Sequence, residues 1–145
     1  SQNAGMSFKN VLKLAKKTDK PVVIHSRKAE LDAIEILEEF GMKKVVMHSF
    51  NGKKALIRRC VDNGWFFSVP TVITRLHHFT TLVELVPVEQ LLTETDAPYL
   101  SPVAGKRNES SNVGITIKEI AKIKNIDEDV AGDLIFNNAK ELFKL

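Results

Sequence analysis

The sequence predicts an α/β fold in which about four parallel strands alternate with helices. Short, almost continuously apolar runs alternate with segments whose apolar residues recur at helical spacing, and this pattern is typical of a parallel sheet covered on both faces. The apolar runs end near His25, His48, Pro70 and Asp96, so the unit repeats every 22 to 26 residues. We therefore expect a regular array of βα units in a single domain, residues 1–145.

The first two units each place a helix before a strand. From residue 8 onward apolar residues recur at i, i+3, i+4 and i+7, which predicts a helix, and Pro21 marks its end before the strand PVVIHS. The same spacing over residues 29–40 predicts a second helix. Gly41 is its expected end, and KVVMHSF reads as the next strand.

The next two units repeat this order. We expect a helix over residues 53–63, which Gly64 ends before the strand WFFSVP. Apolar positions over residues 79–86 predict another helix, which ends at Pro87, and LLTETD is the fourth strand.

The carboxyl-terminal part combines a long loop with two helices. The segment APYLSPVAGKRNESSNVG contains two prolines, two glycines and several Ser and Asn residues, which predicts a loop of the kind that is often functional. Two helices then follow, one over residues 113–124 and one that begins at an Asp127 N-cap and runs toward Phe143.

Composition places the chain among globular proteins. The sequence has 43% hydrophobic and 27% charged residues, and it contains no apolar tract long enough to span a membrane. Its single cysteine, Cys60, cannot form an internal disulfide and is expected to pack in the core. These features predict a cytoplasmic protein. Residues 1–59 hold 13 Lys and Arg against 6 Asp and Glu, which fits either contact with phosphates or ordinary solvated helix faces.

Three residues with ligand-type side chains stand at the ends of predicted strands. His25, His48 and Asp96 occupy matching places in their units, and the carboxyl ends of parallel strands meet on one face of an α/β fold. Imidazole and carboxylate groups bind divalent metal ions, so the sequence predicts a metal site there. His77 and His78 lie outside this pattern and are interpreted as surface residues.

Further polar residues lie near these strand ends. Glu94 precedes Asp96 by two residues, so both carboxylates point to the same side of a regular strand. The spacing leaves open whether Glu94 binds a metal directly or holds the second nitrogen of a histidine. Arg27, and Lys106 with Arg107 in the long loop, fit contacts to phosphate as well as ordinary surface charge.

The segments PVVIHSR, HSFNG, LLTETDAPYL, GKRNESSN and NNAKELF together resemble the TatD family of metal-dependent deoxyribonucleases. The resemblance covers residues 8–145 and implies a (β/α)₈ TIM barrel that binds one or two divalent ions, Mg²⁺, Mn²⁺ or Zn²⁺. It implies His25, His48 and Asp96 as metal ligands, with Asp96 also a catalytic proton acceptor, and DNA as the substrate. The loop residues that match a family motif near the site are Arg107, Asn108 and Glu109.

The sequence lacks two other motifs of that family. The amino-terminal HxH motif and the GEIGLD-like segment, which carries a glutamate ligand, are both absent. A complete barrel of this type needs about 250 residues, so the resemblance implies the carboxyl-terminal part of a TatD-type barrel with an incomplete metal site.

Three functions remain open on this basis. The first is hydrolysis of phosphodiester bonds in DNA. The second is a catalytically inactive half barrel that associates with itself and serves as an interaction module, because an open half barrel exposes sheet edges and apolar surface. The third is a hydrolase with the same fold that acts on another ester, such as D-aminoacyl-tRNA.

Overall fold

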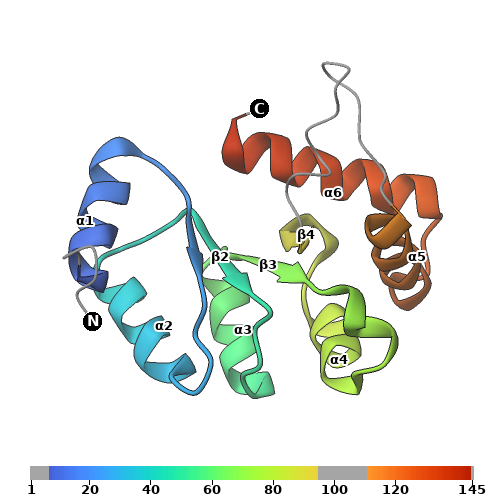
Figure 1. Ribbon diagram of the computed structural model, residues 1–145, viewed down its shortest axis with the longest axis horizontal. Coiled ribbons are helices and arrows are strands. Elements are labelled where there is room, and N and C mark those ends of the chain that lie inside the picture. Colours follow the sequence, from blue (N-terminus) through green and yellow to red (C-terminus); the bar gives the residue numbers. More distant parts are fainter. Residues whose placement is uncertain (1–6, 95–110, 145) are drawn as a thin grey trace.

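The computed structural model describes residues 7–94 and 111–144 and shows a four-stranded sheet flanked by helices (Figure 1). Its elements, in chain order, are α1 (Phe8–Thr18), β1 (Val22–Ile24), α2 (Glu30–Glu39), β2 (Val45–His48), α3 (Lys54–Asp62), β3 (Phe66–Val69), the 3₁₀ helix η2 (Thr71–Thr74), α4 (His77–Leu85), the 3₁₀ helix η3 (Val88–Gln90), β4 (Leu91–Thr93), α5 (Ser111–Lys124) and α6 (Glu128–Phe143).

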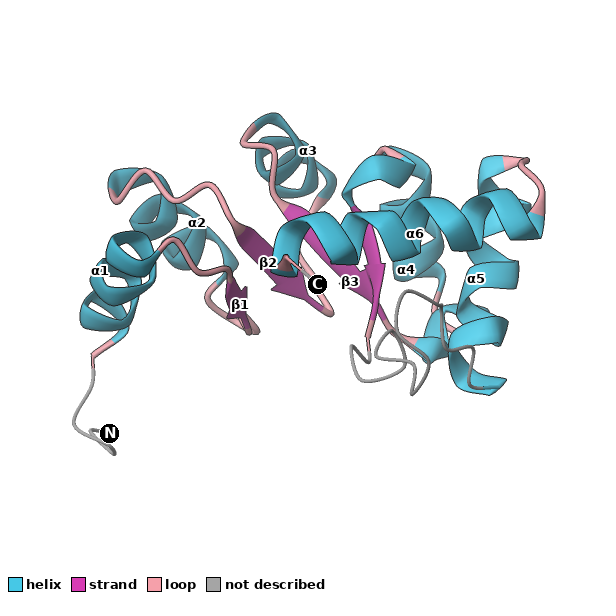
Figure 2. Cartoon of the chain, turned by 90° about the horizontal axis from the view of Figure 1, so that it is seen from above, coloured by secondary structure: helices cyan, strands magenta, loops and turns pink. Residues whose placement is uncertain are grey.

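The strands lie side by side in chain order, and all three pairings are parallel. The sheet order is β1-β2-β3-β4, with Val46 opposite Phe66 and Ser68 opposite Leu92 in the register. A helix connects each strand to the next, and α2, α3 and α4 follow one another along one face of the sheet (Figures 1 and 2). This arrangement confirms the predicted fold class, four parallel strands of a partial TIM-type (β/α) barrel.

The predicted helices are all present, and some of their expected ends are confirmed. Gly41 and Gly64 follow helices with positive φ angles of 62° and 77°, a conformation that glycine adopts at low cost. The carboxylate of Asp127 accepts hydrogen bonds from the backbone of Asp129 and Val130, as expected of an N-cap. Among the described residues, no helix is both long and apolar enough to cross a membrane.

Two short 3₁₀ helices were not predicted from the sequence. Each begins directly after a proline, with Pro70 at the N-cap of η2 and Pro87 at the N-cap of η3. The carbonyl of Pro70 accepts a hydrogen bond from the Ile73 amide, and the carbonyl of Pro87 accepts one from the Gln90 amide. Single turns of this kind have no apolar periodicity, so the pattern that predicts longer helices does not detect them.

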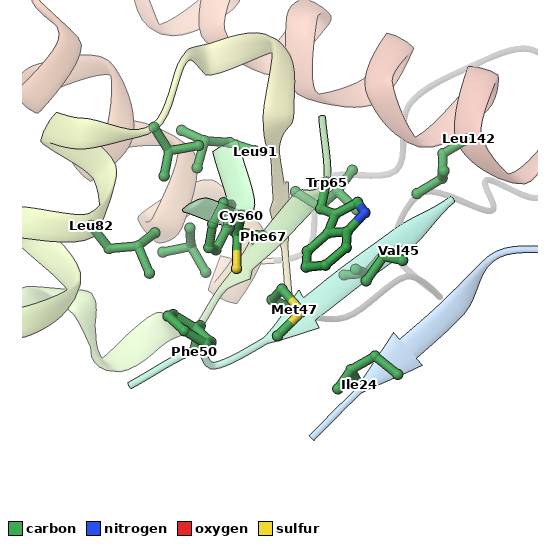
Figure 3. Close-up of a cluster of buried hydrophobic side chains, with 14 of the residues drawn as sticks. Ile24, Val45, Met47, Phe50, Cys60, Trp65, Phe67, Leu82, Leu91 and Leu142 are labelled. Atoms are coloured by element: carbon green, nitrogen blue, oxygen red, sulfur yellow. The ribbon is translucent and has the colours of Figure 1, made fainter. Parts of the chain in front are cut away.

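The core lies between the sheet and its helices and is centred on large side chains (Figure 3). Trp65 and Phe67 are fully buried, and the indole Nε1 of Trp65 donates a hydrogen bond to the Met42 carbonyl at 2.9 Å. Cys60 belongs to this core, as predicted, and burial raises the pKa of its thiol to about 12. The thiol is therefore protonated and unreactive at neutral pH.

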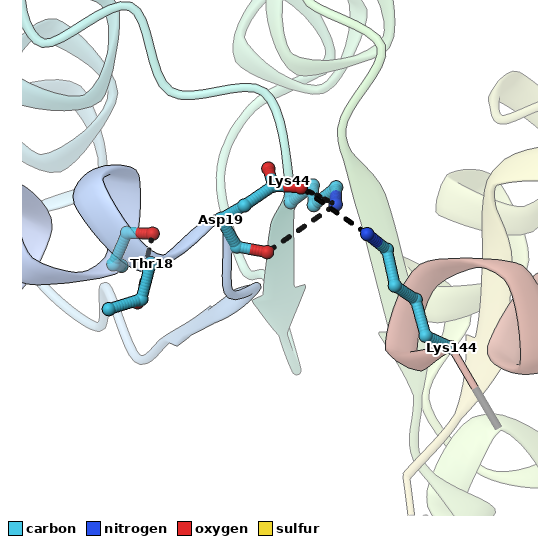
Figure 4. Close-up of polar contacts among 5 residues, drawn as sticks. Thr18, Asp19, Lys44 and Lys144 are labelled. Carbon is cyan, nitrogen blue, oxygen red and sulfur yellow. Dashed lines mark hydrogen bonds and ion pairs between the residues drawn. The ribbon is translucent and has the colours of Figure 1, made fainter.

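The last helix crosses the amino-terminal ends of the strands. The amide of Asn138 donates hydrogen bonds to the carbonyls of Val88 and Leu91, at the start of β4. Beyond the end of the helix, Lys144 lies 3.4 Å from the carboxylate of Asp19, which also binds Lys44 at 2.8 Å (Figure 4). Because these contacts lie at the amino ends of the strands, α6 leaves the opposite, carboxyl edge of the sheet free for a functional site.

Candidate metal centre

Two of the predicted metal ligands, His25 and His48, meet at the carboxyl edge of the sheet. β1 and β2 are neighbours, and Ile24 pairs with Met47. The residues that follow them, His25 and His48, therefore lie side by side. The imidazole centroids are 4.3 Å apart, with the ring planes at 51°. Two imidazoles at this spacing can both donate a nitrogen to one divalent ion.

Glu94 holds one nitrogen of His48. Its Oε2 lies 2.9 Å from His48 Nδ1, and Nδ1 forms a hydrogen bond with the Ser68 hydroxyl at 3.1 Å. The Ser68 hydroxyl gives its own hydrogen to Glu94 and therefore accepts from the ring, so Nδ1 carries the proton. In the neutral ring, Nε2 then keeps its lone pair, and this nitrogen has no hydrogen-bond partner among the described residues. A carboxylate that fixes the histidine tautomer in this way is common behind metal-binding histidines.

Two hydroxyl donors and one imidazole nitrogen converge on the carboxylate of Glu94. The hydroxyls of Ser49 and Ser68 each donate to it at 2.8 Å, in addition to the contact with His48. The side chain is only 19% exposed, and a buried charge is costly unless hydrogen bonds compensate for its lost hydration. The site supplies these bonds from two neighbouring strands, which explains how a strand at the edge of the core tolerates the charge.

The HSFNG segment shapes the site through its backbone. Ser49 has a positive φ angle of 46°, an uncommon conformation for a side-chain-bearing residue that often occurs at functional sites. The ring of Phe50 packs edge-on against Phe67 at 5.9 Å. A Cβ atom on Gly52 would overlap the Phe50 ring, so the segment requires glycine at that position.

A pocket of about 640 Å³ opens beside the two histidines. All four histidines of the chain line it, including His77 and His78 at the start of α4. His77 is exposed, as expected of a surface residue. The same interpretation is wrong for His78, which is half-buried and whose Nε2 donates to the Phe50 carbonyl at 2.9 Å. Sequence reasoning missed them because they follow the unpredicted helix η2 rather than a strand.

Several predicted site residues lie outside the described part of the chain. Within residues 7–94 and 111–144, no three His, Cys, Asp or Glu side chains are grouped closely enough to hold a metal ion. The two imidazoles and the carboxylate behind one of them fit a divalent ion in type, but they make an incomplete set on their own. The predicted residues outside the described ranges are Asp96, Lys106, Arg107, Asn108 and Glu109.

The profile of one protein family, described as TatD related DNase, matches residues 2–144. Among similar proteins, an uncharacterized metal-dependent hydrolase of Methanocaldococcus jannaschii is 36% identical over 137 residues, which cover 94% of this chain and 54% of that protein. The human protein named Deoxyribonuclease TATDN3 is 36% identical over 132 residues, which cover 91% of this chain and 48% of that protein.

A solved structure shows the same fold. The crystal structure of a TatD homolog from Escherichia coli superposes with a TM-score of 0.77 at 26% identity, and the match covers 94% of this chain and 54% of that one. The chain thus spans about half the length of the curated relatives and the solved structure that it matches.

Proposed function

Because the chain belongs to the family of TatD related DNases, we propose that it contributes to the metal-dependent hydrolysis of phosphodiester bonds in DNA. One observation carries this proposal: His25 and His48 lie together at the carboxyl edge of the sheet, and Glu94 holds His48 so that Nε2 can bind an ion. A relative described as a deoxyribonuclease and others described as metal-dependent hydrolases support it.

Each residue of the site has a distinct part in this proposal. His25, His48 and Asp96 would hold the ion, and Glu94 keeps His48 in the tautomer that can bind it. A bound divalent ion supplies Lewis-acid stabilisation of the phosphoryl oxygens and favours deprotonation of a water molecule. Asp96 would accept the proton of the attacking water, and Arg27, which lines the pocket, would contact the phosphate.

Metal dependence tests the proposal. Incubated with a fluorescent DNA oligonucleotide, the protein should cleave it in the presence of Mg²⁺, Mn²⁺ or Zn²⁺, should stop when EDTA is added, and should recover when the ion is restored. Cleavage that persists in EDTA would contradict a metal-dependent mechanism. Hydrolysis of D-aminoacyl-tRNA but not of DNA would favour the other ester as the substrate.

Self-association is a second candidate property, alone or together with catalysis. β1 forms one edge of the described sheet, and beside it Phe8 and Val23 line a groove with their side chains 38% and 47% exposed. Val11 and Leu14 extend this apolar surface along α1. Two copies that pair β1 of one with β4 of the other would give eight parallel strands, the number that closes a TIM barrel, so we propose a second copy as the partner.

Val23→Lys should abolish this association. In light scattering coupled to size exclusion, the parent chain should have about twice the 16.2 kDa of one copy, and the variant should have the mass of one copy, because a charge in the contact would lose its hydration. Val130→Lys is the matched control, since Val130 is similarly exposed on α6, away from the groove. A parent chain that stays monomeric at high concentration would rule out the paired half barrel.

A further inference from the structure

The pocket beside the histidines carries only positive or neutral groups among the residues that line it. Of the described residues that line it, Arg27 and Arg75 are the arginines, four are histidines, and none is an aspartate or glutamate. A concave site of one sign concentrates ions of the opposite sign. The chemistry of this pocket therefore suits an anion.

Both arginines present exposed side chains to the pocket. Neither forms a hydrogen bond or an ion pair with another residue of the described ranges 7–94 and 111–144. Elsewhere in the described chain the comparable guanidinium of Arg59 is paired with Glu38, which lowers the pKa of that carboxyl to about 2. A planar guanidinium matches the oxygens of a phosphate with two parallel hydrogen bonds.

The two arginines that line the pocket follow different strands of the sheet. Arg27 follows β1, whereas Arg75 follows β3 through η2, and β2 with His48 lies between these strands in the sheet. The pocket has a volume of about 640 Å³, so it can hold a ligand much larger than one phosphate group.

We propose that Arg75, with His77 beside it, forms a second phosphate subsite that binds the phosphodiester next to the one that is cleaved. The inference rests on the proposed function, in which Arg27 and the metal ligands hold the scissile phosphate. It implies that the substrate is a DNA strand with at least two phosphodiester bonds, and that Arg75 positions this DNA strand in the site.

Binding without turnover tests this subsite. In EDTA, fluorescence anisotropy with a labelled single-stranded DNA oligonucleotide should show about tenfold weaker binding by Arg75→Gln than by the parent chain, since a hydrogen bond to a charged group is lost. The slope of log affinity against log salt should fall by about one, because one phosphate contact is removed. Arg58→Gln, which removes an equally exposed arginine from α3, outside the pocket, should change neither value.

Substrate length separates the subsite from the cleavage site. With metal present, Arg75→Gln should cleave a dinucleotide with one phosphodiester at the parental rate and should show a raised KM only for a trinucleotide with two. Equal losses of DNA affinity in Arg75→Gln and Arg58→Gln would show that the arginines act only through general electrostatic attraction at the surface, and would overturn the inference. Parental binding by Arg75→Gln, in a protein that still cleaves DNA, would overturn the subsite and leave the proposed function intact. Failure of the parent chain to bind or cleave DNA would refute both.

Discussion

His48→Ala should lower the rate of DNA cleavage by more than about 100-fold. His48 supplies one of the two imidazoles at the carboxyl edge of the sheet and is the one whose tautomer Glu94 fixes. Removing a residue that hydrogen-bonds to a metal ligand lowers metal affinity or activity by about 10- to 100-fold, and removing the ligand itself should lower them further. The measurement is kcat/KM on a DNA oligonucleotide with saturating metal.

The loss in this variant should be chemical rather than structural. The imidazole of His48 is 26% exposed, so its removal leaves the buried core unchanged, and the thermal unfolding midpoint should stay within a few degrees of the parent value. Calorimetric titration should show weaker or absent metal binding in the same sample. A folded variant that cleaves DNA at the parental rate would remove His48 from the site.

Glu94→Gln should weaken metal binding by about 10- to 100-fold while the fold is kept. The amide has nearly the shape of the carboxylate, but it has one acceptor oxygen instead of two, so its NH₂ group must face either Ser49 or the Ser68 and His48 side. When the NH₂ group faces His48, the ring can accept a hydrogen bond from it only after Nδ1 loses its proton, and the neutral ring then carries its proton on Nε2, which blocks the ligand nitrogen. Metal affinity by calorimetry measures the effect.

The tautomer of His48 distinguishes this explanation from a general weakening of the protein. Imidazole ¹⁵N chemical shifts should report a proton on Nδ1 in the parent chain and on Nε2 in the Glu94→Gln variant. Glu89→Gln is the control, because Glu89 is an exposed carboxylate just before β4 and does not line the pocket. An unchanged tautomer together with unchanged affinity would show that Glu94 has no part in metal binding.

The sequence was sufficient to predict the order of strands and helices, because buried strands and amphipathic helices have distinct apolar spacing. It also predicted that His25 and His48 would be neighbours, since residues that end parallel strands share one edge. The role of Glu94 could not be chosen from spacing, because a position two residues before Asp96 fixes only the side of the strand. The structure shows its contact with His48.

Other residues of the site were not predicted from the sequence, because their positions depend on contacts that form only in the folded chain. Ser49 and Ser68 carry hydroxyls that are common everywhere, and only the register of β2, β3 and β4 makes them donors to one carboxylate. Arg75 and His78 reach the pocket because η2 turns the chain after β3, a local turn that leaves no periodic signal.

The hydrogen bonds to Glu94 have a consequence for assembly of the fold. They join β4 to β2 and β3, so they can form only when these strands are aligned as observed. A shift of one residue in β3 would turn Ser68 to the opposite face and leave the carboxylate short of a donor, at a cost of about 1–3 kcal/mol. The carboxylate that orients His48 thus also favours the observed alignment of the strands. A misaligned sheet would be both less stable and unable to bind the ion.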